Sequence, residues 1–334
     1  MPTLSPKENM IRLYKGEIPE YVPSMMDGGS FMGPMLGPDL MGFMAEWDSD
    51  VKYDLFGVPN VREWNANNGP IPQPGVFILD DITKWRDVIK RPPILDEIDW
   101  QLLADQQLPH WDPSTFKTGM ASVGNGYFQI LASFMGFDMA LISCVEEPEE
   151  VKDLLNFILG MNNELAKKFI YYYEPETGGN ADDIAHERAP FISIEMFEDI
   201  FEPLWRADIL PYIEAGCLTS HHNCGMFEPL VPYIVDMGFN AWNPAEWMND
   251  LVGIKQRFPK LALCGGFNDD RVRKPEHTEE DIRAYVREVV DELAPGGGYA
   301  FGGYMMGPPG DPVVEQRMGW MYDEFEKIRY SYYD

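Results

Sequence analysis

The second half of the chain alternates amphipathic stretches with short apolar runs. Residues 148–173 carry apolar side chains at helical spacing, and further helical stretches begin after the capping residues Ser193 and Thr278. Short strand-like runs lie between them, most of them just after a glycine, at 217–225 (a strand with its loop), 239–242, 261–264 and 299–301. Strands that alternate with helices in this way predict a parallel sheet with helical connections.

The first half is less regular. A helix is expected over 6–15, because Ser5 can cap it, Pro6 suits its first turn and Glu8 completes a capping box. Further expectations are a short strand that runs into a Gly-rich loop over 21–29, helix and irregular chain over 94–118, and strands at 76–79 and 119–123. Residues 30–75 show little periodicity, which predicts long loops with short helices near one mouth of the fold.

These elements predict one domain, over residues 1–334, with a closed α/β fold. No Gly-x-Gly-x-x-Gly motif opens a helix, which argues against a dinucleotide-binding sheet. A (β/α)8 TIM barrel suits both the number of repeating units and the length of 334 residues. No interdomain linker is recognisable.

Charge narrows the classes of partner. The chain has 26 Lys and Arg against 55 Asp and Glu, a formal charge of -29, which disfavours nucleic acids, anionic membranes and polyanionic substrates. No apolar run reaches the length of a membrane span, and the first residues do not resemble a signal peptide. With 4 cysteines and no disulfide pattern, we expect a cytoplasmic protein with reduced thiols, for which a homodimer is compatible with the sequence.

Residues of metal-ligand type gather where the predicted strands end. In a barrel, the carboxyl ends of the strands form one active-site mouth. All these strand ends except the last carry His, Cys or Glu, and they lie at 182–187, 220–225, 243–246, 264–269 and 302–306.

His222 and Cys224 are the central candidates. They are two positions apart, so an extended chain presents both on one side. Zinc prefers thiolate, imidazole and carboxylate ligands, and Cys264 and Glu246 on the next strand ends are expected to complete the site. The alternative is that Cys264 is a buried strand cysteine and His222 a hydrogen-bonded polar residue. His221 is expected to face the barrel wall.

Other side chains at the same mouth are candidates for substrate binding: Asp27, Asp182, His186, Glu187, Tyr304 and Met305. Asp183 beside Asp182 is a further candidate, and for both a structural role is equally open. The Met and aromatic residues of 24–75 and 301–306 suit an apolar pocket, with core packing as the alternative.

Several motifs resemble the uroporphyrinogen decarboxylase superfamily. They are Pro6-Lys7-Glu8-Asn9 and the stretches 191–197, 222–225, 243–244 and 265–268. The resemblance covers nearly the whole chain, is strongest from about 120 to 310, and implies a (β/α)8 barrel.

Two branches of the superfamily differ in the residues that their sites contain. Its decarboxylases carry an Arg-rich loop after the first strand, whereas the loop at 25–30 here has no Arg. Its corrinoid-dependent methyltransferases hold zinc through a His-x-Cys pair, which His222 and Cys224 match. Their third ligand lies at the eighth strand end, where this chain has Gly302-Gly303, so Cys264, Glu246 or Glu187 is expected to replace it.

The methyltransferase branch implies methyl transfer between a small molecule and the cobalt of a corrinoid on a partner protein. A methoxylated aromatic ether is the favoured donor, as in the methyltransferase I component of an O-demethylase, with His222, Cys224 and Glu246 as catalytic residues. The opposite direction is also possible, in which the methyl group passes from the corrinoid to a zinc-bound thiol. Two alternatives are a decarboxylase of the uroporphyrinogen type and a non-catalytic barrel that binds a small molecule.

Overall fold

The centre of the fold is a five-stranded parallel sheet. The computed structural model describes residues 2–34, 50–62, 69–119, 122–124, 126–308 and 310–333. In the sheet the strands follow the order β10-β9-β8-β7-β6, and each pair is parallel. Their bounds are β6 (Thr177–Ala181), β7 (Leu218–His222), β8 (Ala241–Ala245), β9 (Ala262–Gly266) and β10 (Tyr299–Gly302).

Both edges of this sheet continue into the first half of the chain. At the β10 edge, Ser24 forms a parallel bridge with Phe301. At the β6 edge, the backbone N–H of Glu176 donates to the carbonyl of Lys117 at 3.0 Å. Lys117 belongs to β5 (Phe116–Thr118), which pairs in parallel with β1 (Gly29–Phe31). The α/β fold with a parallel sheet is therefore confirmed, and it is consistent with the predicted TIM barrel.

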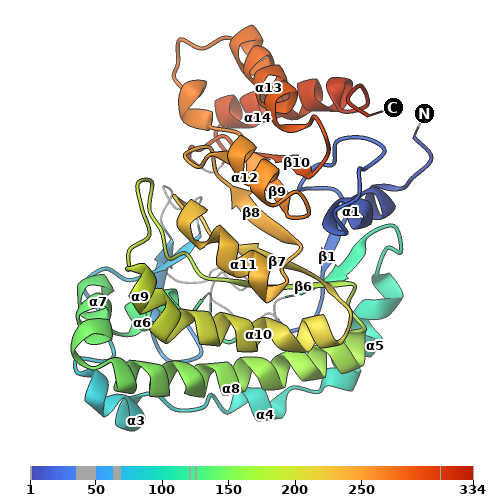
Figure 1. Cartoon of the computed structure of the whole chain (residues 1–334). Helices are drawn as coiled ribbons and strands as arrows, with labels where there is room; N and C mark the ends of the chain where they lie inside the picture. Colours follow the sequence, from blue (N-terminus) through green and yellow to red (C-terminus); the bar gives the residue numbers. More distant parts are fainter. Residues whose placement is uncertain are drawn as a thin grey trace.

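Helices cover the outer face of the strands (Figure 1). The prediction for the longest one is confirmed, since α8 is Pro148–Tyr173. Ser193 caps α9 (Ile194–Met196), which continues through the π-helical turn Phe197–Phe201 into α10 (Glu202–Glu214). The remaining outer helices are α11 (Val231–Met237), α12 (Leu251–Arg257), α13 (Glu279–Leu293) and α14 (Pro312–Ile328). Large aromatic side chains such as Trp205, Trp242 and Phe197 fill the space between strands and helices and are fully buried.

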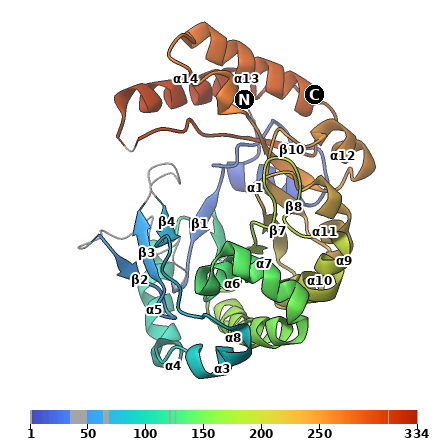
Figure 2. The ribbon, with the colours of Figure 1, turned by 90° about the vertical axis from the view of Figure 1, so that its left-hand side faces the viewer.

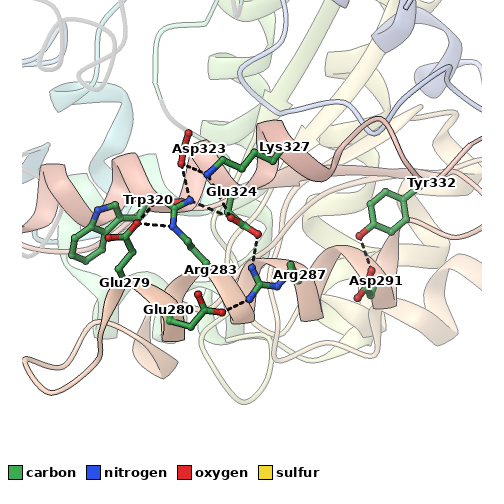
Figure 3. A network of polar contacts seen from close by, with 10 residues as sticks. All are labelled: Glu279, Glu280, Arg283, Arg287, Asp291, Trp320, Asp323, Glu324, Lys327 and Tyr332. Carbon is green, nitrogen blue, oxygen red and sulfur yellow. Dashed lines mark hydrogen bonds and ion pairs between the residues drawn. The ribbon is translucent and has the colours of Figure 1, made fainter. Parts of the chain in front are cut away.

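The last two helices are joined by a network of ion pairs, shown in Figure 3. The carboxylate of Glu324 on α14 contacts Arg283 at 3.1 Å and Arg287 at 2.5 Å, both on α13. Arg283 also reaches Asp323 at 2.7 Å. Because Glu324 is buried between two guanidinium groups, this network fixes α14 against α13 on the side of the molecule away from α8.

The first half contains short elements around α1 (Pro6–Tyr14), whose predicted capping box is present. An antiparallel sheet consists of β2 (Lys52–Tyr53), β3 (Pro59–Arg62) and β4 (Pro70–Pro72). The helices that follow are Ile82–Lys84, α3 (Trp85–Val88), α4 (Ile94–Glu97), α5 (Trp100–Gln107) and Leu108–His110, then α6 (Tyr127–Met135) and α7 (Phe137–Glu146). Figure 2 shows α6, α7 and the small sheet on the same side of the parallel strands.

Three predictions for this half were wrong in detail. Residues 76–79 form no strand, because the N–H groups of Ile78 and Leu79 donate to the Phe134 carbonyl at the end of α6. The strand in this region is Phe116–Thr118, and of the strand expected at 119–123 the residues 120 and 121 lie outside the described residues. Within 30–75, the described residues form strands rather than short helices, and 35–49 and 63–68 lie outside the described residues.

In the part of the chain that the structure describes, no single helix has the length and apolar character needed to cross a membrane. Taken together, α6 and α7 have the length and composition of a membrane span, but the pair is bent by 109°.

Candidate metal centre

His222 is the last residue of β7, and its ring is held in a fixed orientation. Its Nδ1 lies 3.0 Å from Oδ1 of Asn243 on the neighbouring strand. When Nδ1 carries the proton for this contact, the lone pair of Nε2 is free for a ligand bond. That Nε2 faces the Cys224 Sγ at 3.8 Å, so the two predicted residues do converge.

Asp183 is the third member of the group. Its Oδ1 accepts a hydrogen bond from the Cys224 N–H at 2.7 Å and lies 3.9 Å from His222 Nε2. Its Oδ2 accepts from Nε2 of Gln129 on α6 at 3.1 Å. One ligand atom from each of Asp183, His222 and Cys224 lies within 4.8 Å of the others, so these residues can hold a metal ion. Nitrogen, sulfur and oxygen donors of this kind fit zinc.

The register of β6 against β7 explains why Asp183, and not Asp182, joins this group. β6 pairs with β7 so that Ala181 lies beside His222. Because successive side chains alternate across a strand, His222, Ala181 and then Asp183 share one face. Asp182 faces the other way.

Glu246 lies next to this group and adds negative charge. Its carboxylate accepts a hydrogen bond from the Gly225 N–H. Burial raises the pKa of the Cys224 thiol, and the carboxylates of Asp183 and Glu246 raise it further. Burial also raises the pKa of Glu246. A divalent cation would reverse this balance, because it favours the thiolate and the carboxylate as ligands. The predicted ligand role of Glu246 stays a prediction.

Cys264 is not brought into the group. It is buried in the middle of β9, and its thiol is hydrogen-bonded to the hydroxyl of Tyr14 on α1. It lines a separate cavity of about 180 Å³ together with Met25 and Ser220. The structure therefore matches the alternative expectation, a buried strand cysteine, and Asp183 occupies the place that Cys264 was expected to take.

Asp182 holds two helices together and does not face the mouth. Its fully buried carboxyl accepts from the Phe128 N–H at the start of α6 and from Nε1 of Trp205 on α10, each at 3.0 Å. Burial raises its pKa to about 7. This arrangement corrects the expectation of substrate binding, because the carboxyl oxygens are already occupied by protein donors. His221 lies on the same outer face, against Trp205 and Phe227, as expected.

The other predicted substrate residues are spread over different environments. Asp27 forms an ion pair with Arg329 and lines the smaller cavity beside Cys264. His186 is exposed, and its ring stacks on Phe191 with centroids 5.6 Å apart. Glu187 is also exposed, whereas Met305 is buried in the core. Tyr304 lines the larger cavity at the metal group.

That larger cavity has a volume of about 840 Å³. Its lining includes Asp183, His222 and Cys224 and the aromatic side chains of Phe77, Phe128, Phe137 and Phe191, which are called the aromatic wall below. Residues 69–75, from β4 and the segment after it, also line it. A metal-binding group and an aromatic lining therefore belong to one cavity, which is the general form of a small-molecule site.

Comparisons with known proteins agree with this architecture. A family model described as Uroporphyrinogen decarboxylase (URO-D) matches residues 119–308. A solved structure, a methyltransferase from Methanosarcina mazei, superimposes with a TM-score of 0.61 at 13% identity, over 97% of this chain and 99% of that chain. At this identity the likeness shows the fold alone. No curated protein matches the sequence.

Proposed function

Because the chain belongs to the uroporphyrinogen decarboxylase (URO-D) family, we propose that it is an enzyme of the methyltransferase branch rather than a decarboxylase. It would use zinc to move the methyl group of a methoxylated aromatic ether to the cobalt of a corrinoid carried by a partner protein. The observation that carries this proposal is the convergence of Asp183, His222 and Cys224 in an aromatic-lined cavity.

The same three side chains would hold the zinc, with Glu246 available as a further ligand. Bound there, zinc supplies a Lewis acid for the oxygen that leaves with the aromatic ring. Asn243 sets the tautomer of His222, and Gln129 orients Asp183. Both contacts keep ligand atoms pointing at one position before substrate arrives, which lowers the cost of assembling the site.

The aromatic wall positions the substrate. A methoxyarene that stacks against Phe137 and Phe191 places its ether group at the metal group, where water is displaced. In the reaction the C–O bond breaks with its electron pair on the phenolic oxygen, and the methyl group passes to the reduced cobalt of the partner. A proton from solvent then neutralises the phenolate.

Decarboxylation of a porphyrinogen is less compatible with this site. Such a substrate carries several carboxylates, which require cationic partners. The loop at 25–30 contains no Arg, and no Lys or Arg is among the described residues that line the larger cavity.

The test is methylation of free cob(I)alamin by 2-methoxyphenol, followed by absorbance. The purified protein with zinc is expected to form methylcob(III)alamin, and a chelator is expected to stop the reaction. His222→Ala should lose activity, and Asn156→Ala, an exposed change on α8, should retain it. Formation of coproporphyrinogen from uroporphyrinogen, without any methyl transfer, would overturn the proposal.

A further inference from the structure

The charge of the cavity indicates which methoxyarenes the site accepts. We propose that the larger cavity selects neutral methoxyarenes and excludes those with a carboxylate, so that 2-methoxyphenol is a substrate and 4-hydroxy-3-methoxybenzoate is not. This inference rests on the proposed function and adds the substrate class within it.

The first observation is the lack of cationic groups around the cavity. No Lys or Arg is among its lining residues within the described part of the chain. Arg62 and Arg188 belong to segments that border it, but neither lines it. The segments outside the described residues add none, because the sequence of 35–49, 63–68, 120–121 and 125 contains no Lys, Arg or His. Between Gly16 and Thr83 the chain has Lys52 and Arg62 as its cationic residues.

The second observation is that the lining does contain carboxylates, and each has a protein partner. Asp54 accepts hydrogen bonds from the N–H groups of Phe56 and Val58, both at 2.9 Å. Asp183 belongs to the metal group. With its methoxy group at the zinc, a substrate that also has a ring carboxylate would bring this carboxylate out of water among described lining residues that include Asp54 and Asp183 but no Lys or Arg. Unpaired like charges at such a site cost several kcal/mol, which corresponds to a discrimination of at least about 100-fold.

The third observation concerns the wall that receives the ring. Phe128 and Phe137 meet edge to face with centroids 5.5 Å apart, and Phe137 and Phe191 do so at 4.9 Å. Phe77 and Phe137 remain 47% and 44% exposed, so ring surface is open to a ligand. Aromatic side chains in these geometries can pack against a further ring.

The experiment compares the two donors on the full-length protein loaded with zinc. Initial rates of cob(I)alamin methylation give kcat/KM for 2-methoxyphenol and for 4-hydroxy-3-methoxybenzoate. We expect at least about a 100-fold preference for the neutral donor. Equal values, or a preference for the benzoate, would overturn the inference.

A gain-of-function variant tests the physical cause. Ser133 on α6 and Gln73 after β4 both line the cavity, so Ser133→Arg and Gln73→Lys place a cation there on two different elements. In either variant the ratio of kcat/KM for the neutral donor to that for the benzoate should fall by about 10-fold or more, because the added cation pairs with the carboxylate. Gln101→Arg, an exposed change on α5 outside the cavity, should leave the preference unchanged. If both folded variants keep the wild-type preference, charge is not its cause and the inference fails.

Binding measurements test this inference independently of the proposed function. Calorimetric titration with the demethylated products, catechol and 3,4-dihydroxybenzoate, needs no methyl transfer. Tighter binding of catechol supports the selectivity even if no donor reacts, in which case the proposed function fails alone. Equal or tighter binding of the benzoate removes the selectivity even if 2-methoxyphenol is demethylated.

Discussion

Asn243 Oδ1 and His222 Nδ1 lie 3.0 Å apart across two neighbouring strands, and this contact turns the other ring nitrogen toward Cys224. Side chains that orient a metal-binding histidine in this way strengthen the site without touching the ion. Asn243→Ala is therefore expected to weaken zinc binding by about 10- to 100-fold. Competition with a chromophoric chelator measures this, with Asn156→Ala as the control. Unchanged affinity would show that the contact does not support the site.

The two cysteines of the predicted site should behave differently. Cys224 lies in the metal group, whereas the thiol of Cys264 is buried against Tyr14. Cys224→Ser is expected to lose most of the bound zinc, because the thiolate is its strongest donor there. Cys264→Ser should retain the wild-type zinc content, as measured by mass spectrometry of the dialysed proteins. If Cys264→Ser lost the zinc and Cys224→Ser kept it, Cys264 would be the ligand instead.

Asp182 should matter for stability rather than for substrate affinity. Asp182→Ala leaves the donors of Trp205 and Phe128 without their acceptor, and we expect it to lower the free energy of unfolding by about 2–4 kcal/mol. Asp182→Asn keeps an oxygen acceptor and is expected to cost less. Urea denaturation measures both. A raised KM with unchanged stability would show instead that this carboxyl binds substrate.

Stability is expected to fall as the pH rises from about 4 to 6 because of Asp208 on α10. Burial raises its pKa to about 6, and the neighbouring polar groups of Tyr127, Asn180 and Asn162 oppose that rise only in part. The folded state therefore keeps a proton that the unfolded state has released above about pH 4. The resulting loss is at most about 1.4 kcal/mol per pH unit for this group.

Asp208→Asn removes this titration. Urea denaturation at several pH values should show the difference in unfolding free energy, variant minus wild type, increasing with pH across that window. The exposed Asp236→Asn serves as the control. A difference that stays constant with pH would mean that Asp208 does not hold the proton.

The second half of the fold could be predicted from sequence because its signals are local. The range 148–173 was predicted for α8 from apolar spacing, and Thr278 with Asp281 forms the capping box that starts α13. The first half depends on distant partners instead. The apolar run 76–79 is expected to be a strand on its own, but the end of α6 takes its N–H groups, and no local pattern encodes that contact.

The candidate site, too, could be predicted only where the signal is local. Alternation along one strand was enough to pair His222 with Cys224. Choosing between Asp182 and Asp183 required the register of β6 against β7, which depends on how two strands pair. Cys264 has the right residue type and lies on the right strand, but the position of α1 places Tyr14 against its thiol, and a sequence pattern does not contain that packing.

The central claim is that Asp183, His222 and Cys224 bind one zinc ion, and X-ray absorption at the zinc edge tests it most directly. The account predicts a single sulfur ligand at about 2.3 Å, nitrogen and oxygen ligands at about 2.0–2.2 Å, and loss of the sulfur signal in Cys224→Ser but not in Cys264→Ser. A spectrum with no sulfur ligand, or one that Cys224→Ser leaves unchanged, would contradict it.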